Sequence, residues 1–259
     1  MIRCGPTPSS GELRGFQLVE DHDFSRASEI LSFEEARRAY YVDFEGPSGG
    51  EPVLFGWLYA EGRDASPDRL VMRHDMLDPD LASIAGEVEV SADWDYRQDA
   101  RSLATSINDL ARRANAQDRR IVAWSRHEMT KVVESELDPD LIEMFSESFR
   151  DGKATAKRWL AQCRPDVVLA RDESGGTHKL TRYMDLTGYE APEDYEVGRT
   201  ALNIRRVRTG MEKRGSWDDL VESQQGAWGD VLEHNAVDVQ ALMHIVCHAA
   251  LELENSAGR

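Results

Sequence analysis

Two apolar segments on either side of a glycine- and proline-rich turn constrain the fold of this 259-residue chain most strongly. Residues 39–45 and residues 53–60, VLFGWLYA, have the length and composition of buried strands. The sequence GPSGGEP between them is typical of a turn, so the pair predicts an antiparallel hairpin. RLVMRHDM, residues 69–76, predicts a third strand that continues the antiparallel meander.

After these strands the apolar periodicity changes from strand-like to helical. RRIVAWS, residues 119–125, again predicts a short buried strand, and a helix is expected to begin near His127. Because a long helix precedes this strand, we expect it to return parallel to the first one. That preceding amphipathic helix is predicted over residues 99–116, where apolar side chains recur at helical spacing: Leu103, Ile107, Leu110 and Ala111.

The second half of the chain reads as mostly helical. Short helices are predicted over residues 138–151 and 153–163, a small hairpin within residues 166–180, and further helix from residue 217 to 254. The predicted fold class is therefore α/β: a mixed sheet of three antiparallel strands followed by parallel strands, flanked by helices, with helical insertions in the C-terminal half.

A chain of 259 residues can form one large domain, or at most two, and we expect one. Residues 1–28 are rich in Gly, Pro and Ser and are expected to form a flexible N-terminal arm, and residues 29–259 to form the domain. The sequence contains no run of about 18 apolar residues, so no membrane span is predicted. The N-terminus has no apolar signal core, so we expect a cytoplasmic protein. The three cysteines are scattered and predict no disulfide framework.

Two carboxylates stand in the middle of the first predicted strand, where burial of a charge is costly. Asp43 and Glu45 point to the same side of that strand, because side chains alternate along a strand with a period of two. An exposed strand face would accommodate them, and so would a cation that lies between them.

Further acids stand at two other positions. Glu128 lies where the strand at residues 119–125 passes into a helix, and Asp238 lies four residues after His234 on the same face of a late helix. Converging carboxylates repel one another unless hard cations neutralise them, and oxygen ligands favour Mg²⁺ or Mn²⁺. Two such ions can activate a water and stabilise the leaving oxygen of a phosphodiester. His234 would then accept the water's proton, since histidine titrates near neutral pH.

At these residues the chain resembles the DEDD-type 3′–5′ exonucleases of the ribonuclease H-like superfamily, in particular the predicted RecB-type and YprB-like nuclease branch. The three motifs stand here as VDFEG, WSRHE and HNAVDV. The stretch HKLTRYMDLTGYEAP, residues 178–192, is similar to the one that precedes the third motif in that family. The resemblance covers roughly residues 39–250.

The resemblance implies a ribonuclease H-like fold, two divalent metal ions and 3′–5′ hydrolysis of DNA or RNA, on single-stranded or frayed 3′ ends. His234 stands where the family has a tyrosine, the general-base position, and Glu128 stands where aspartate is commoner. The metal ligands carried over from the motifs are Asp43, Glu45, Glu128 and Asp238.

A nucleic-acid substrate must be reconciled with a formal net charge of −17, since phosphate binding normally depends on Lys and Arg. Carboxylates that bind cations account for part of that charge. Basic residues are also clustered locally, although a solvated helix face is an equal alternative for residues 199–214. The residues expected to hold the nucleic-acid backbone are Lys179, Arg182, Arg205, Arg206, Arg208, Lys213 and Arg214.

Two other functions stay open from the sequence. The chain could keep the fold without the chemistry, as a nucleic-acid-binding or scaffolding subunit whose acidic surface meets a basic protein partner. It could also act in a proofreading-like role within a larger complex.

Overall fold

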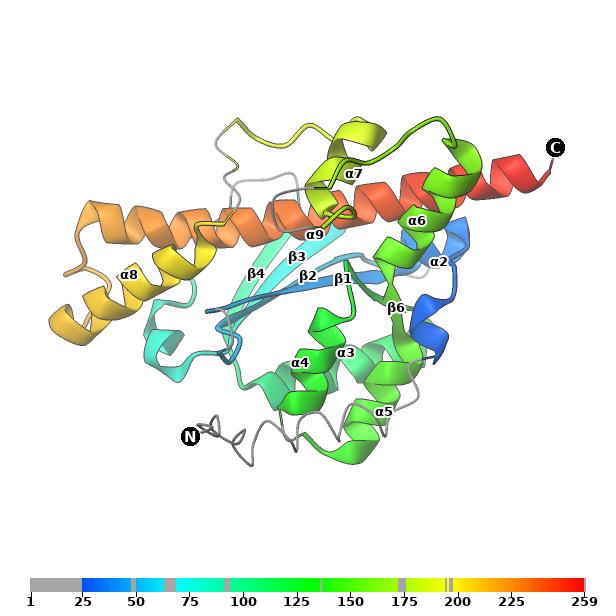
Figure 1. The fold of residues 1–259 in the computed structure, drawn as a ribbon. Helices are drawn as coiled ribbons and strands as arrows, with labels where there is room; N and C mark the ends of the chain where they lie inside the picture. The colour runs from blue at the N-terminus through cyan, green and yellow to red at the C-terminus, as the bar shows by residue number, and fades with distance from the viewer. Residues whose placement is uncertain are drawn as a thin grey trace, which may run out of the picture.

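A six-stranded mixed sheet forms the centre of the protein in the computed structural model (Figure 1). The structure describes residues 25–47, 50–62, 69–90, 94–135, 137–171, 176–193, 195 and 198–258. The strand order is β4-β3-β2-β1-β5-β6, antiparallel from β1 to β3 and parallel for β3 with β4, β1 with β5 and β5 with β6. The strands are β1 Tyr40–Glu45, β2 Leu54–Ala60, β3 Leu70–Met76, β4 Asp95–Ala100, β5 Ile121–Ala123 and β6 Phe149–Asp151.

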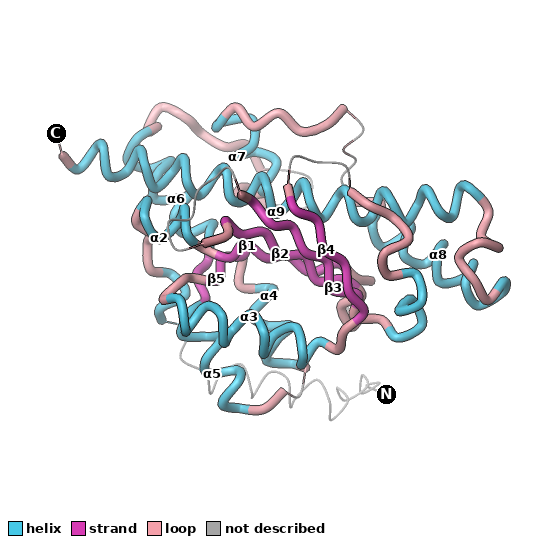
Figure 2. The backbone as a smooth tube through the Cα atoms, turned by 180° about the vertical axis from the view of Figure 1, so that it is seen from behind, coloured by secondary structure: helices cyan, strands magenta, loops and turns pink. Residues whose placement is uncertain are grey.

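Helices cover both faces of this sheet (Figure 2). One face carries α3 Leu103–Gln117, α4 His127–Glu134 and α5 Pro139–Ser148. The other face is crossed by α9 Glu222–Ala257, which packs against β1 and β2 and also contacts α2, α6, α7 and α8. The bounds of the remaining helices are η1 Ser25–Ser28, α2 Phe33–Arg38, η2 Pro79–Ile84, α6 Gly152–Cys163, α7 Leu180–Thr187 and α8 Thr200–Arg214.

Alternation along β1 assigns its side chains to the two cores. Tyr40 and Val42 are buried with α3 and α5, whereas Tyr41 is buried on the face covered by α9. Because the period along a strand is two, Asp43 and Glu45 lie on the same face as Tyr41. The first strand therefore presents both carboxylates toward α9.

The helix α9 is the central support of that face. Its buried side chains include Val231, Leu242 and Val246, which pack in the same core cluster as Tyr41. By length and composition alone α9 could cross a membrane. However, 50% of its most apolar 18-residue stretch is buried inside the protein, as is usual for the core helix of a folded domain.

The structure confirms the predicted antiparallel meander and the parallel return strand, within one or two residues at each end. The helix predicted from residue 99 begins later, at Leu103, after the N-cap Ser102, which accepts a hydrogen bond from the backbone of Thr105. The prediction missed β4, which precedes it. That edge strand, DYRQDA, is polar and largely exposed, so no apolar alternation marks it.

Two predictions in the second half were wrong. The helix expected over residues 138–151 ends at Ser148, and Phe149–Asp151 form β6, a three-residue strand too short to show a period. The hairpin expected within residues 166–180 is not formed, because the described residues there, 166–171 and 176–180, include no strand and α7 begins at Leu180. Val168, one of the apolar residues on which that prediction depended, is 89% exposed and therefore does not belong to a buried strand.

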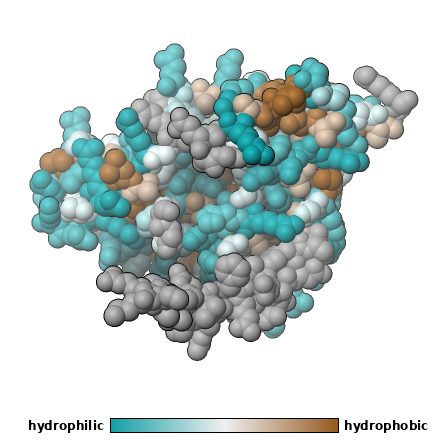
Figure 3. All heavy atoms as spheres, viewed as in Figure 1, coloured by the Kyte–Doolittle hydropathy of each residue, from teal (hydrophilic) through white to brown (hydrophobic). Residues whose placement is uncertain are grey.

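Hydrophobic side chains gather over α7 and the segment that connects it to α6, on an otherwise largely hydrophilic face (Figure 3). Most of the predicted N-terminal arm, residues 1–24, lies outside the described residues, whereas Ser25–Ser28 form η1 and bury Ala27 in the core. Cys163 and Cys247 are free thiols, as the scattered cysteines predicted, and Cys4 lies outside the described residues.

Candidate metal centre

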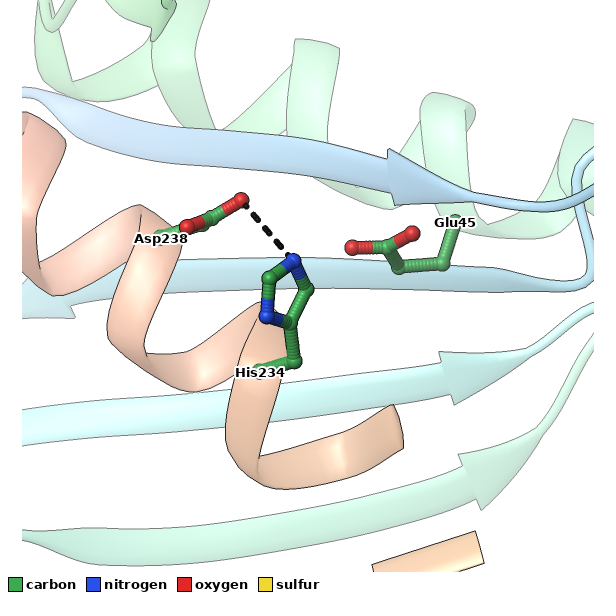
Figure 4. Close-up of side chains that lie close together, drawn as sticks. All are labelled: Glu45, His234 and Asp238. Carbon is green, nitrogen blue, oxygen red and sulfur yellow. Dashed lines mark ion pairs between the residues drawn. The ribbon is translucent and has the colours of Figure 1, made fainter. Parts of the chain in front are cut away.

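The side chains of Glu45, His234 and Asp238 point toward one another between β1 and α9 (Figure 4). One possible ligand atom from each residue lies within 4.8 Å of those of the other two. His234 Nε2 lies 3.6 Å from Asp238 Oδ2, one helical turn away. Oxygen ligands bind Mg²⁺ or Ca²⁺ at about 2.0–2.6 Å, so ligands on opposite sides of one ion are about 4–5 Å apart. The three residues therefore have a spacing that suits a single cation.

Asp43 and Glu128 extend this group to four carboxylates. Asp43 stands two residues before Glu45, and Glu128 lies in the first turn of α4, directly after β5. Since β5 runs parallel to β1, the carboxyl ends of both strands meet at one edge, where α/β proteins commonly bind ligands. Burial, and then the three other negative charges, raise the pKa of Asp43 well above its ordinary value. The four carboxylates therefore interact.

The electrostatic cost of this arrangement is visible in the other acids. Burial and then the charge of Asp238 raise the pKa of Glu45 from 4.5 to about 8. Burial raises the pKa of Glu128 from 4.5 to about 7 and also raises that of Asp238. Near neutral pH the group therefore retains protons unless a cation replaces them, and metal binding would release those protons.

A buried chain of hydrogen bonds ends on Asp43. Asn235 Nδ2 donates to Asp43 Oδ2 at 2.9 Å, and Asn235 Oδ1 lies 3.1 Å from His74 Nε2. Because that amide oxygen can only accept, His74 carries its proton on Nε2, and His74 Nδ1 accepts from the Tyr96 hydroxyl at 2.9 Å. In this series of hydrogen bonds every donor therefore points along the series toward the Asp43 carboxylate. Such aligned bonds polarise one another and hold Asp43 in one orientation.

The register of the strands explains how this series of hydrogen bonds fits between the sheet and α9. Asp43, Gly56 and His74 are directly opposite one another on β1, β2 and β3. Asn235 spans the middle position, and a Cβ atom on Gly56 would lie 1.6 Å from Asn235 Oδ1. A glycine at residue 56 is therefore what lets α9 bring Asn235 down onto the sheet. Burial also lowers the pKa of His74 to about 3, so its ring stays neutral.

Tyr195 brings a further contact from the segment before α8. Its hydroxyl donates to Asp238 Oδ1 at 2.5 Å. Its ring stacks on that of His234, with centroids 4.9 Å apart and planes at 10°. Burial and then the charge of Asp238 raise the pKa of Tyr195, so the phenol remains a donor. Tyr195 thus holds both the histidine and one ligand oxygen.

The imidazole of His234 has unused bonding capacity. Its Nδ1 is buried and has no hydrogen-bond partner within the described part of the chain. Figure 4 shows that the other ring nitrogen, Nε2, faces Asp238 and Glu45, whereas Nδ1 lies on the side of the ring away from Glu45. Buried polar atoms normally have a partner, so a water would satisfy Nδ1, and Nε2 is the atom available to the carboxylates. The ring can therefore act either as a base or as a metal ligand.

The basic residues expected to hold nucleic acid fall into two regions. Lys179 and Arg182 are exposed at the start of α7. Arg208 instead contacts the buried Asp78, the N-cap of η2. Figures 1 and 2 place α8 at the opposite end of α9 from α6. Of the basic residues predicted on α8, those exposed to solvent are Arg205, Arg206, Lys213 and Arg214.

Sequence reasoning identified the acids and His234 but missed the residues that orient them. His74 and Gly56 stand in strands read only as core, although a histidine and a glycine within apolar runs are a signal of an unusual contact. Asn235 lies within the quoted HNAVDV motif and received no role. Tyr195 stands in a segment without periodicity, so nothing in the sequence marks it.

No protein-family model matches this chain, and neither a curated protein nor a solved structure is significantly similar to it.

Proposed function

We propose that this protein is a metal-dependent nuclease that hydrolyses phosphodiester bonds of DNA or RNA, acting 3′–5′ on single-stranded or frayed ends. One observation carries the proposal: four carboxylates from three separated segments converge beside His234, whose Nε2 lies 3.6 Å from Asp238 Oδ2. Nothing else in the surroundings of these carboxylates explains four converging negative charges, because no arginine or lysine forms an ion pair with them among the described residues.

The sheet supports the same conclusion. The segment β3-β2-β1-β5-β6 of the sheet, antiparallel and then parallel, has the arrangement expected of a ribonuclease H-like fold, with β4 as an additional edge strand. The acids also stand where the motif resemblance requires them: in the first strand, after the strand parallel to it, and on the last helix. We therefore include the ribonuclease H-like fold in the proposal.

The proposal includes two Mg²⁺ or Mn²⁺ ions, and the carboxylate-rich donor set supports hard cations of this kind. Asp43, Glu45, Glu128 and Asp238 would hold them, and when bound the ions would neutralise the carboxylates, acidify a water and stabilise the leaving oxygen. Asn235 keeps the Asp43 carboxylate in place. His234 would accept the proton of the attacking water, with Tyr195 fixing the plane of its ring.

One observation favours a second function, a catalytically impaired scaffolding or nucleic-acid-binding subunit. Both oxygens of Asp238 are engaged, Oδ1 by the Tyr195 hydroxyl and Oδ2 by the nearby His234 Nε2. In such a protein these contacts would replace the cation and satisfy Asp238 permanently.

Digestion of end-labelled single-stranded DNA and RNA with Mn²⁺, Mg²⁺ or EDTA distinguishes the two functions. We expect metal-dependent shortening from the 3′ end by the wild-type protein, and a loss of at least about a hundredfold in Asp43→Asn and Asp238→Asn. Asp218→Asn, an exposed acid outside the candidate metal centre, is the matched control. Cleavage that survives in EDTA, or in both variants of the centre, would refute the nuclease.

A further inference from the structure

A basic pocket lies beside α6 in this acidic protein. It has a volume of about 440 Å³, within the range of about 300–1,000 Å³ typical of ligand pockets. Its charged lining combines four cations with one carboxylate, a local formal charge of +3 in a chain of net charge −17. These residues, which define the basic pocket, are Arg126, Lys153, Lys157 and Arg158 with Asp151.

The two lysines have no carboxylate partner. Among the described residues, neither Lys153 nor Lys157 has an acid within the 4.0 Å of an ion pair. Asp151 is already in use, since it caps α6 by accepting from the backbone nitrogen of Lys153 at 3.0 Å. Like charges held together on one wall repel one another, so an anion that enters the pocket would be bound favourably.

The basic pocket adjoins the candidate metal centre. Arg126, at the N-cap of α4, precedes Glu128 by two residues. Gly152, the first residue of α6, packs so closely that a Cβ atom there would lie 3.0 Å from Leu242, one turn beyond Asp238 on α9.

We propose that the basic pocket binds a backbone phosphate of a single-stranded nucleic acid whose neighbouring phosphodiester lies in the candidate metal centre. This inference rests on the proposed nuclease function and deepens it, because it places the substrate along α6 rather than along α8. A phosphodiester carries one negative charge and presents its oxygens to lysine and arginine donors. The proximity of the carboxylates favours a chain that spans both sites over a separate small anion.

Fluorescence anisotropy of a short labelled oligothymidylate tests the assignment, with Ca²⁺ in place of Mn²⁺ so that the probe stays intact. In the double variant Lys153→Gln/Lys157→Gln we expect binding about tenfold weaker or more. The magnitude of the slope of log affinity against log salt should fall by about 0.7, because each phosphate contact on a single strand contributes about 0.7 and the double variant loses one. Arg112→Glu, an exposed residue of α3 on the other face of the sheet, should change neither quantity.

Two results would overturn the proposal. In the first, the double variant binds like wild type, whether or not Arg205→Glu/Arg206→Glu on α8 weakens binding. Inorganic phosphate or a mononucleotide that competes as well as the oligonucleotide would show that the pocket serves small phosphates. A Mn²⁺ titration followed by electron paramagnetic resonance measures the candidate metal centre independently of the basic pocket. Binding through these lysines without any hydrolysis contradicts only the proposed nuclease, and hydrolysis that does not depend on them contradicts only the basic pocket.

Discussion

Replacing Glu45 by glutamine should make the metal-free protein more stable at alkaline pH. Burial and the charge of Asp238 raise the pKa of Glu45 from 4.5 to about 8. The folded state therefore binds a proton at this site that the unfolded state releases, so the contribution to stability is full below about pH 4.5 and is lost as the pH rises through about 8. Glu45→Gln keeps the shape of the side chain and removes this titration.

The magnitude follows from the same values. A rise from 4.5 to about 8, at about 1.4 kcal/mol for each pH unit, corresponds to roughly 5 kcal/mol. Only the part of this change above pH 5, about 4 kcal/mol, falls between pH 5 and pH 9, and solvent screening of the partly exposed Glu45 side chain reduces it further. We therefore expect the pH-dependent loss of stability over that interval to be smaller in the variant by roughly 2–4 kcal/mol. Removing one charge also relieves its repulsion of the neighbouring acids, which acts in the same direction.

Urea denaturation followed by tryptophan fluorescence in EDTA measures the effect at several pH values. The free energy of unfolding of the wild type should fall with rising pH, and that of Glu45→Gln should fall less. Mn²⁺ should restore the wild type at alkaline pH and stabilise the variant less. Glu212→Gln, an exposed acid on α8, is the control. A wild-type stability that is constant or rises from pH 5 to pH 9 would show that these carboxylates are not buried together.

Two further substitutions test the contacts around the centre. Gly56→Ala should lower the free energy of unfolding by about 1–3 kcal/mol or more, because the added Cβ would lie 1.6 Å from Asn235 Oδ1, and the double variant Gly56→Ala/Asn235→Ala should regain part of that loss in urea denaturation. Tyr195→Phe should cost about 1 kcal/mol of stability and raise Mn²⁺ affinity, since it removes the hydroxyl that occupies Asp238 Oδ1. A lower affinity in a Mn²⁺ titration would instead mean that the hydroxyl prepares the ligand.

The parts of the fold that were predicted are those with a strong period or strong punctuation. The hairpin of β1 and β2 is marked by two apolar runs and a Gly-Pro turn, and α3 by its amphipathic spacing. The polar edge strand β4 and the three-residue β6 carry neither signal. These two strands form because β3 and β5 would otherwise leave backbone N–H and C=O groups unpaired on their outer edges. Any neighbouring segment with suitable geometry can form hydrogen bonds with those groups.

The residues of the candidate metal centre also fall into those that local sequence predicted and those that it did not. Residue types and local spacing were sufficient to select Asp43, Glu45 and His234 with Asp238, because alternation and the helical turn are properties of short segments. The supporting contacts of Asn235 and Tyr195 join residues 192 and 43 positions apart in the chain. No local rule reaches across such separations.

The sequence by itself determined a mixed α/β sheet whose first strand presents two acids to one face, since these features follow from the period of a strand and the cost of burying charge. Tertiary structure decided that α9 would lie against that face, that a glycine on β2 would admit Asn235, and that cations of α6 would gather in one pocket with Arg126. The physical reason is that close packing selects which distant side chains meet, and pairwise distances of a few ångströms exist only after the layers have assembled.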